Sequence, residues 1–154
     1  MRVCCLIQAI SLLGVATLTP LLSAQHATSW RDPATGLVWT KQDNGFDVTW
    51  KQAESYCRTV GPNWRLGTVA EVMTLWDPTA NVNGNHIKGE IQITGNDIWT
   101  RSPAPYQGQM RFVLFRNRYW GSDYMGSNNG YRALCVSGFN PGLLTPEADR
   151  AAMR

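Results

Sequence analysis

The sequence contains few of the residues on which catalytic and metal sites depend. Of its 154 residues only two are histidine and four are cysteine, and charged residues make up 16%. His86 is the one histidine expected inside the folded region, so no Ser/His/Asp catalytic set can be assembled. No Cys-x-x-Cys pair occurs, which removes the commonest zinc and redox motifs. We therefore expect no enzyme activity, no metal site and no cofactor.

The sequence also lacks a strong charge and any internal repeat. Fourteen Lys and Arg face 11 Asp and Glu, a net charge of +3. That field is too weak to indicate a nucleic-acid-binding protein by itself. With 154 residues the chain has room for one domain.

The N-terminal residues have the pattern of an export signal. Arg2 precedes an apolar run over 3–15, and the small pair Ser23-Ala24 follows. The run is shorter than the roughly 20 apolar residues that span a membrane. We predict a signal peptide over 1–24, cleaved to give a secreted or periplasmic protein without membrane insertion. A permanent N-terminal anchor is the alternative.

Cysteine counting connects export with the fold. Cys4 and Cys5 leave with the predicted signal peptide, so Cys57 and Cys135 remain as an even pair. In an oxidising compartment such a pair predicts a disulfide. A reactive thiol or a metal ligand is the rival interpretation.

Two helices are predicted from caps and periodicity together. Residues 49–52 and 68–71 both have the form of a capping box, with Thr first and Gln or Glu three positions later. Apolar residues then recur at helical spacing, which predicts short helices over about 49–60 and 68–76.

The rest of the sequence predicts short strands and long loops. We expect β-strands over 37–40, 98–102, 111–115, 119–120 and 131–137. Because helices come early and strands mostly late, the fold class is α+β, with a twisted, mainly antiparallel sheet. The predicted domain spans 25–139, and 140–154 is expected to be a flexible polar tail.

Five motifs in fixed order resemble a known family. They are Asp32 to Trp39 (DPATGLVW), Thr49 to Cys57 (TWxxAxxYC), Trp64 to Glu71 (WRLGTxxE), Trp99 to Ser102 (WTxS) and Tyr131 to Val136 (YRALCV). Together they resemble the Lcl C-terminal domain family of bacteria over roughly residues 30–137. Gly67 is a departure, since members usually carry proline there.

The resemblance implies a fold and a class of ligand. Members are similar in fold to C-type lectins and formylglycine-generating enzymes, and in C-type lectins a cysteine of the first helix bonds to one of the last strand. Cys57 and Cys135 occupy those places here. The family's namesake adhesin is associated with sulfated glycosaminoglycans, which implies glycan binding. The calcium-dependent sugar signatures of C-type lectins, Glu-Pro-Asn and Trp-Asn-Asp, are absent.

A basic, aromatic stretch is the predicted binding region. Between 101 and 135 five arginines face one acid, and arginine suits sulfate, carboxylate and phosphate groups. Tyrosines, tryptophan and a polar loop lie among these arginines. The candidate ligand-binding residues are Arg116, Arg118, Trp120, Asp123, Tyr124, Asn128 and Asn129.

Two functions stay open at this stage. The first is an exported recognition module for glycans or sulfated, anionic polysaccharides at the cell surface. The second is a structural or protein-interaction domain, in which the arginines lie singly on solvent faces and the aromatic residues fill the core. The sequence decides neither the ligand nor the oligomeric state.

Overall fold

The computed structural model describes residues 28–154. The predicted signal peptide, 1–24, lies outside the described residues and stays a prediction. Within 28–154 no helix has the length and apolar character needed to cross a membrane.

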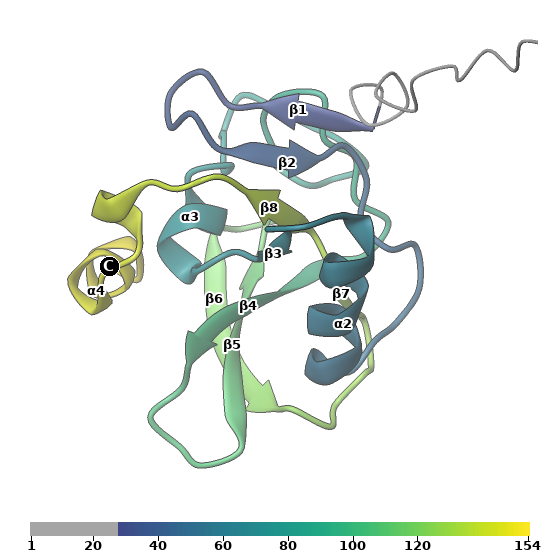
Figure 1. The fold of residues 1–154 in the computed structure, drawn as a ribbon, viewed down its shortest axis with the longest axis vertical. Helices are drawn as coiled ribbons and strands as arrows, with labels where there is room; N and C mark the ends of the chain where they lie inside the picture. The colour runs from purple at the N-terminus through teal and green to yellow at the C-terminus, as the bar shows by residue number, and fades with distance from the viewer. Residues whose placement is uncertain (1–27) are drawn as a thin grey trace, which may run out of the picture.

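Short helices and strands alternate with long loops (Figure 1). The helices are α2 (Trp50–Val60), α3 (Val69–Met73), the 3-10 turn η1 (Pro141–Leu143) and α4 (Pro146–Ala152). The strands are β1 (Ser29–Arg31), β2 (Val38–Thr40), β3 (Arg65–Leu66), β4 (Asp97–Pro103), β5 (Gln109–Leu114), β6 (Tyr119–Tyr124), β7 (Tyr131–Arg132) and β8 (Cys135–Ser137). The α+β class is therefore confirmed.

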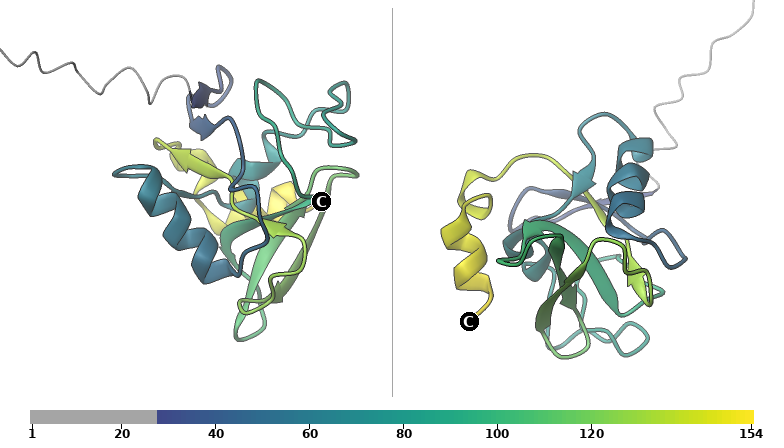
Figure 2. Two further views of the ribbon diagram at one scale, coloured as in Figure 1. Left: turned by 90° about the vertical axis from the view of Figure 1, so that its right-hand side faces the viewer. Right: turned by 90° about the horizontal axis from the view of Figure 1, so that it is seen from below.

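The strands form two four-stranded sheets. One has the order β1-β2-β8-β3 and is antiparallel throughout. The other has the order β6-β5-β4-β7, in which β7 lies parallel to β4. In Figures 1 and 2, α2 and α4 lie on opposite sides of the molecule, with the β4–β6 sheet between them.

Both predicted capping boxes are present. The Thr49 hydroxyl accepts from the backbone N–H of Gln52, whose side chain accepts from the N–H of Thr49, and Thr68 and Glu71 repeat the pattern. The second helix ends at Met73, three residues before the predicted end. Its last turn tightens because the N–H groups of residues 74–76 bond to carbonyls three residues back.

Two hydrophobic clusters make up the core, and the disulfide lies in one of them. The disulfide cluster consists of Val48, Ala53, Cys57, Leu66, Trp99, Tyr131, Ala133 and Cys135. A Cys57–Cys135 bond joins α2 to β8 across 78 residues, which confirms the predicted pairing. The central cluster combines residues of β2, α3, β4, β5 and β8 with residues of the loops between them. Its members are Leu37, Trp39, Val69, Val72, Met73, Leu75, Ile87, Ile91, Ile93, Ile98, Val113, Phe115, Leu134 and Val136.

Gly67 leaves space for a tryptophan. A Cβ added at Gly67 would lie 2.9 Å from Cγ2 of Val72 and 3.1 Å from the ring of Trp39. Trp39 is fully buried, so the ring has nowhere to move. The glycine that departs from the family pattern is thus explained by packing.

Most of 140–154, the segment expected to be a flexible polar tail, is helical in the structure. Residues 141–143 and 146–152 are helical, and Pro146 occupies the first turn of α4 after the Thr145 cap. Leu143, Ala152 and Met153 pack against the central cluster. The polar composition of this segment gives no sign in the sequence that these three apolar side chains pack against the core.

Candidate binding surface

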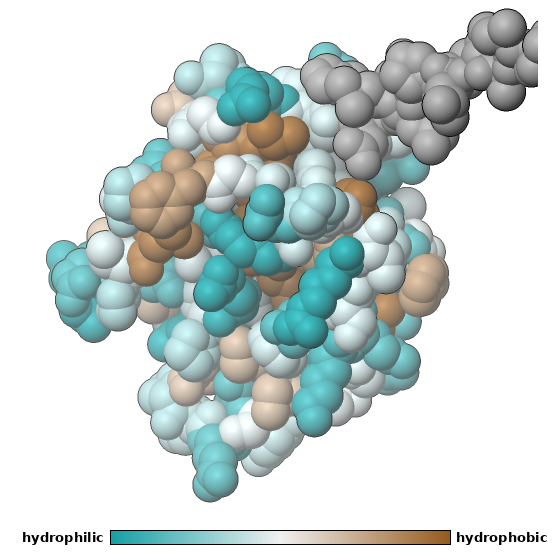
Figure 3. All heavy atoms as spheres, viewed as in Figure 1, coloured by the Kyte–Doolittle hydropathy of each residue, from teal (hydrophilic) through white to brown (hydrophobic). Residues whose placement is uncertain are grey.

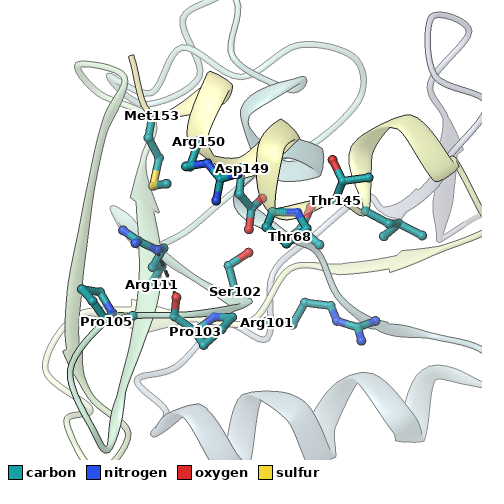
Figure 4. Close-up of a pocket in the computed structure, with 13 residues that line it drawn as sticks. Thr68, Arg101, Ser102, Pro103, Pro105, Arg111, Thr145, Asp149, Arg150 and Met153 are labelled. Carbon is teal, nitrogen blue, oxygen red and sulfur yellow. Dashed lines mark hydrogen bonds between the residues drawn. The ribbon is translucent and has the colours of Figure 1, made fainter.

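A cleft of about 410 Å³ separates α4 from β4 and β5. Figure 4 shows its two walls, with β4, β5 and their connecting loop on one side and α4 on the other. The lining residues are Thr68, Arg101, Ser102, Pro103, Ala104, Pro105, Arg111, Leu144, Thr145, Pro146, Asp149, Arg150 and Met153. We call this hollow the basic cleft.

Arginine dominates the charge of the basic cleft. Arg101, Arg111 and Arg150 line it against the single acid Asp149, an excess of two positive charges. In Figure 4 Arg111 and Arg150 extend from opposite walls toward the same space. The cleft is therefore suited to a negatively charged group.

The arginine of β5 is held in place by its neighbours. Nε of Arg111 donates to the carbonyl of Pro103 at 3.2 Å, and its guanidinium lies 5.1 Å from the ring centroid of Trp120. A guanidinium over an aromatic ring is attracted by the ring quadrupole. Because only Nε is used, the remaining N–H groups of Arg111 stay available to a ligand.

The arginine of β4 has no such partner. Within 28–154 the Arg101 side chain makes no hydrogen bond or ion pair, and the residue is exposed. Its backbone lies in β4 and is also held by a hydrogen bond from its N–H to the carbonyl of Gly67 at 2.8 Å. Arg101 thus presents all its donors to solvent.

A second hollow begins at Arg101. This tryptophan groove, of about 320 Å³, is lined by Trp50, Glu54, Arg58, Trp64, Arg65, Leu66, Arg101 and Met110. In Figure 4 the Arg101 side chain extends away from Arg111 toward α2. The two hollows therefore share Arg101 as a lining residue.

The tryptophans of this groove are anchored and partly exposed. The indole N–H of Trp50 donates to the carbonyl of Thr100 at 2.8 Å, which fixes the ring at the start of α2. Trp64 and Trp50 both pack on the disulfide cluster while keeping part of their surface in the groove. Aromatic faces held in this way are suited to stacking on flat apolar surfaces of a ligand.

The other arginines of the groove are already paired. Arg65 donates to both carboxylate oxygens of the fully buried Glu71 at 2.7 Å, and Arg58 pairs with Glu54 on α2. Such internal pairs neutralise charge locally. The free positive charge of this surface therefore comes from Arg101 and Arg111.

The predicted site residues do not converge on one point. Arg116 and Arg118 lie at the β5–β6 turn, while Tyr124 ends β6 and leads to the loop of Asn128 and Asn129. A strand rises about 3.3 Å per residue, which places Arg118 and Tyr124 roughly 20 Å apart. Tyr124 is 62% exposed, and both asparagines are exposed.

Arg116 and Arg118 differ from the arginines of the cleft. An N–H of Arg116 lies 3.4 Å from the amide oxygen of Asn96, and the Arg118 guanidinium lies 5.5 Å from the ring centroid of Trp76. Neither residue lines the basic cleft or the tryptophan groove. The turn also needs Arg118 at φ 56°, a left-handed conformation.

Trp120 and Asp123 are engaged in internal contacts. The Trp120 indole donates to the carbonyl of Met153 at 3.0 Å, and the Asp123 carboxylate accepts from the Tyr131 hydroxyl at 2.8 Å. Burial acts to raise the pKa of Asp123, but hydrogen bonds from Tyr131, Tyr124 and Ser127 lower that pKa further than burial raises it. Burial and the neighbouring Asp123 raise the pKa of Tyr131, which keeps the phenol protonated as a donor.

Asp97 is the other acid near this position. Burial raises its pKa, and among 28–154 its side chain has no hydrogen-bond donor. Nowhere in this range do three or more His, Cys, Asp or Glu side chains gather as metal ligands would.

Sequence reasoning missed part of this surface. The sequence pattern does not single out these residues, since Arg101 and Arg111 lie among the other arginines of 101–135 and Arg150 lies in the predicted tail. Alternation along β4 gives no signal that Arg101 lies between two hollows. The proline after Thr145 was the one local sign that a helix begins at 146.

The fold and the surface together define a disulfide-tied α+β domain with an arginine-rich surface. A model of the Lcl C-terminal domain family matches residues 28–137. Because this match covers more than two thirds of the 154 residues, the chain belongs to the Lcl C-terminal domain family. The family and the disulfide indicate a domain of the extracellular kind. No curated protein matches the chain.

Proposed function

We propose that this protein is a non-enzymatic recognition domain that binds anionic polysaccharide outside the cytoplasm. The observation that carries the proposal is that Arg101 and Arg111 both line the basic cleft and that neither has an acidic partner in 28–154. Sulfate and carboxylate groups accept the paired N–H bonds that guanidinium offers.

The shape of the surface favours a polymer over a small anion. The basic cleft and the tryptophan groove share Arg101, so one ligand can contact both hollows. Sugar rings present apolar C–H faces that pack on Trp50 and Trp64, while their charged substituents reach the arginines. The predicted export and the disulfide support a ligand met in an oxidising compartment.

The test is binding of the oxidised domain to dextran sulfate. Tryptophan fluorescence measures the affinity, and the salt concentration that elutes the domain from a sulfated resin measures the electrostatic contribution. Changing Arg101→Gln and Arg111→Gln together should weaken binding about tenfold or more and flatten its salt dependence. Polyphosphate serves as a non-sugar anion, and tighter binding of dextran sulfate would support contact with the sugar rings.

A matched control removes the same charge elsewhere. Arg116→Gln with Arg118→Asn takes away two arginines outside both hollows, and asparagine tolerates the left-handed backbone at 118. This variant should change binding less than threefold. Equal losses from the two double variants would mean that only net charge matters, which would overturn the proposed site.

Protein interaction is the second candidate, and one exposed side chain favours it. Phe139, between β8 and η1, is 76% exposed and lines a hollow of about 500 Å³ with Trp64. In Figure 3 apolar colour gathers over the segment from β8 to η1. Loss of a protein contact in Phe139→Ser, without salt-sensitive binding of polyanions, would favour this function over the first.

A further inference from the structure

We propose that residues 140–154, which follow the family domain, form the second wall of the anion site and supply Arg150 to the ligand. This inference rests on the proposed function and goes beyond it, because the family match ends at residue 137. The binding residues of this protein would then include a segment that the family domain does not contain.

Beyond Asn140, three hydrogen bonds hold the segment on the domain. The carbonyl of Leu143 accepts from the Thr68 hydroxyl at 2.9 Å, and the carbonyl of Met153 accepts from the Trp120 indole at 3.0 Å. Between them, Asp149 accepts from the backbone N–H of Ala70 at 2.8 Å. These three bonds, spread over residues 143–153, fix both the position and the rotation of α4.

That rotation decides which side chains face the cleft. Asp149 points into the domain, and the next residue, Arg150, lines the basic cleft opposite Arg111 (Figure 4). The guanidinium of Arg150 is partly used by Glu147, whose carboxylate lies 2.6 Å away on the exposed surface. An exposed pair of this kind is weak, so a sulfate group can replace it.

Asp149 is a positioning residue in this arrangement. Its carboxylate makes no ion pair within 28–154, although three arginines line the same cleft. Its bond to Ala70 instead holds α4 against α3. An amide oxygen accepts the same bond, so Asp149→Asn should keep the wall in place and remove one negative charge from the cleft.

The experiment compares five proteins for dextran sulfate binding: the unchanged domain, a form that stops after Asn140, Arg150→Ala, Asp149→Ala and Asp149→Asn. Stopping after Asn140 should weaken binding roughly tenfold, and Arg150→Ala about threefold. Asp149→Ala should also weaken binding, whereas Asp149→Asn should bind as tightly as the unchanged domain or more tightly. A merely structural role for Asp149 would not predict tighter binding.

Two controls keep the result interpretable. Arg154→Ala removes the same charge from a residue that does not line the cleft, and it should leave binding unchanged. Near-ultraviolet circular dichroism shows whether the shortened form keeps its core. If that form does not fold, the Arg150 and Asp149 variants still test the proposal.

The outcomes separate the two proposals. Full binding by the shortened form and by Arg150→Ala, with loss in the Arg101/Arg111 double variant, would overturn the second wall and leave the proposed function intact. Failure of the unchanged domain to bind any polyanion would overturn both. Protection of the bond after Arg150 from trypsin by dextran sulfate would support direct contact with α4.

Discussion

The two hydrophobic clusters of this domain are closed in different ways. The disulfide cluster is tied covalently, by the bond between α2 and β8. The central cluster is closed on one side by residues 141–153, which are held by hydrogen bonds and apolar contacts. The basic cleft lies on this second side, so its shape depends on contacts that a ligand or a substitution can change.

The largest expected effect comes from removing the covalent tie. Cys57→Ser with Cys135→Ser should lower the free energy of unfolding by about 4 kcal/mol, because a loop of 78 residues is no longer closed in the unfolded chain. Urea unfolding followed by circular dichroism measures this loss. An unchanged urea midpoint after reduction of the native domain would show that the covalent bond does not stabilise the disulfide cluster.

The next effect concerns the ion pair that joins the clusters. Glu71 lies on α3 beside the central cluster, and Arg65 precedes Leu66 of the disulfide cluster. Glu71→Ala leaves a partly buried guanidinium without its partner and removes the bond to Thr68, which should cost about 3 kcal/mol. Glu71→Gln keeps an acceptor for the Thr68 N–H and should cost less. Equal losses in urea unfolding would contradict the role of the capping bond.

A smaller effect tests the packing of the central cluster. Gly67→Ala should destabilise the domain by about 2 kcal/mol, since the new Cβ meets Val72 and the Trp39 ring. Thermal unfolding measures the loss, and Val72→Ala in the same chain should restore part of it. Gly126→Ala is the matched control, because nothing lies within 4 Å of its Cβ position.

The smallest effect is the pH dependence of the free energy of unfolding that arises from two carboxylates next to the disulfide cluster. The folded pKa of Asp123 is lowered, so its contribution is present above the ordinary pKa near 4 and is lost as pH falls through the folded value. Asp97 has a raised pKa in the folded domain, so its contribution to stability is present at low pH and is lost as pH rises through the folded pKa. At pH 7 Asp123→Asn should cost about 1 kcal/mol, and Asp97→Asn should be neutral or stabilising.

Urea unfolding between pH 3 and pH 7 tests both signs. The Asp123→Asn domain should lose less stability than the unchanged domain as the solution becomes acidic. The Asp97→Asn domain should gain stability relative to the unchanged domain, and this gain should be largest near neutral pH. The same slope in both variants would show that the two carboxylates do not have opposite environments.

Local elements were predicted well because their signals are local. The capping boxes at Thr49 and Thr68 were readable, since each needs only a residue and its third neighbour. The β5–β6 pairing brought Arg116 and Arg118 to a turn, and no short pattern reveals that a turn lies far from a cleft. The predicted site grouped residues by sequence distance, whereas β6 separates its two ends in space.

The sequence by itself determined the α+β class and the family, and it predicted the pairing of Cys57 with Cys135, because motifs, caps and cysteine positions are properties of the chain. Only the tertiary structure decided that α4 docks against α3 and that Arg101, Arg111 and Arg150 line one cleft. These three arginines come from β4, β5 and α4. Their meeting depends on long-range packing, in which Asp149 reaches an N–H 79 residues away.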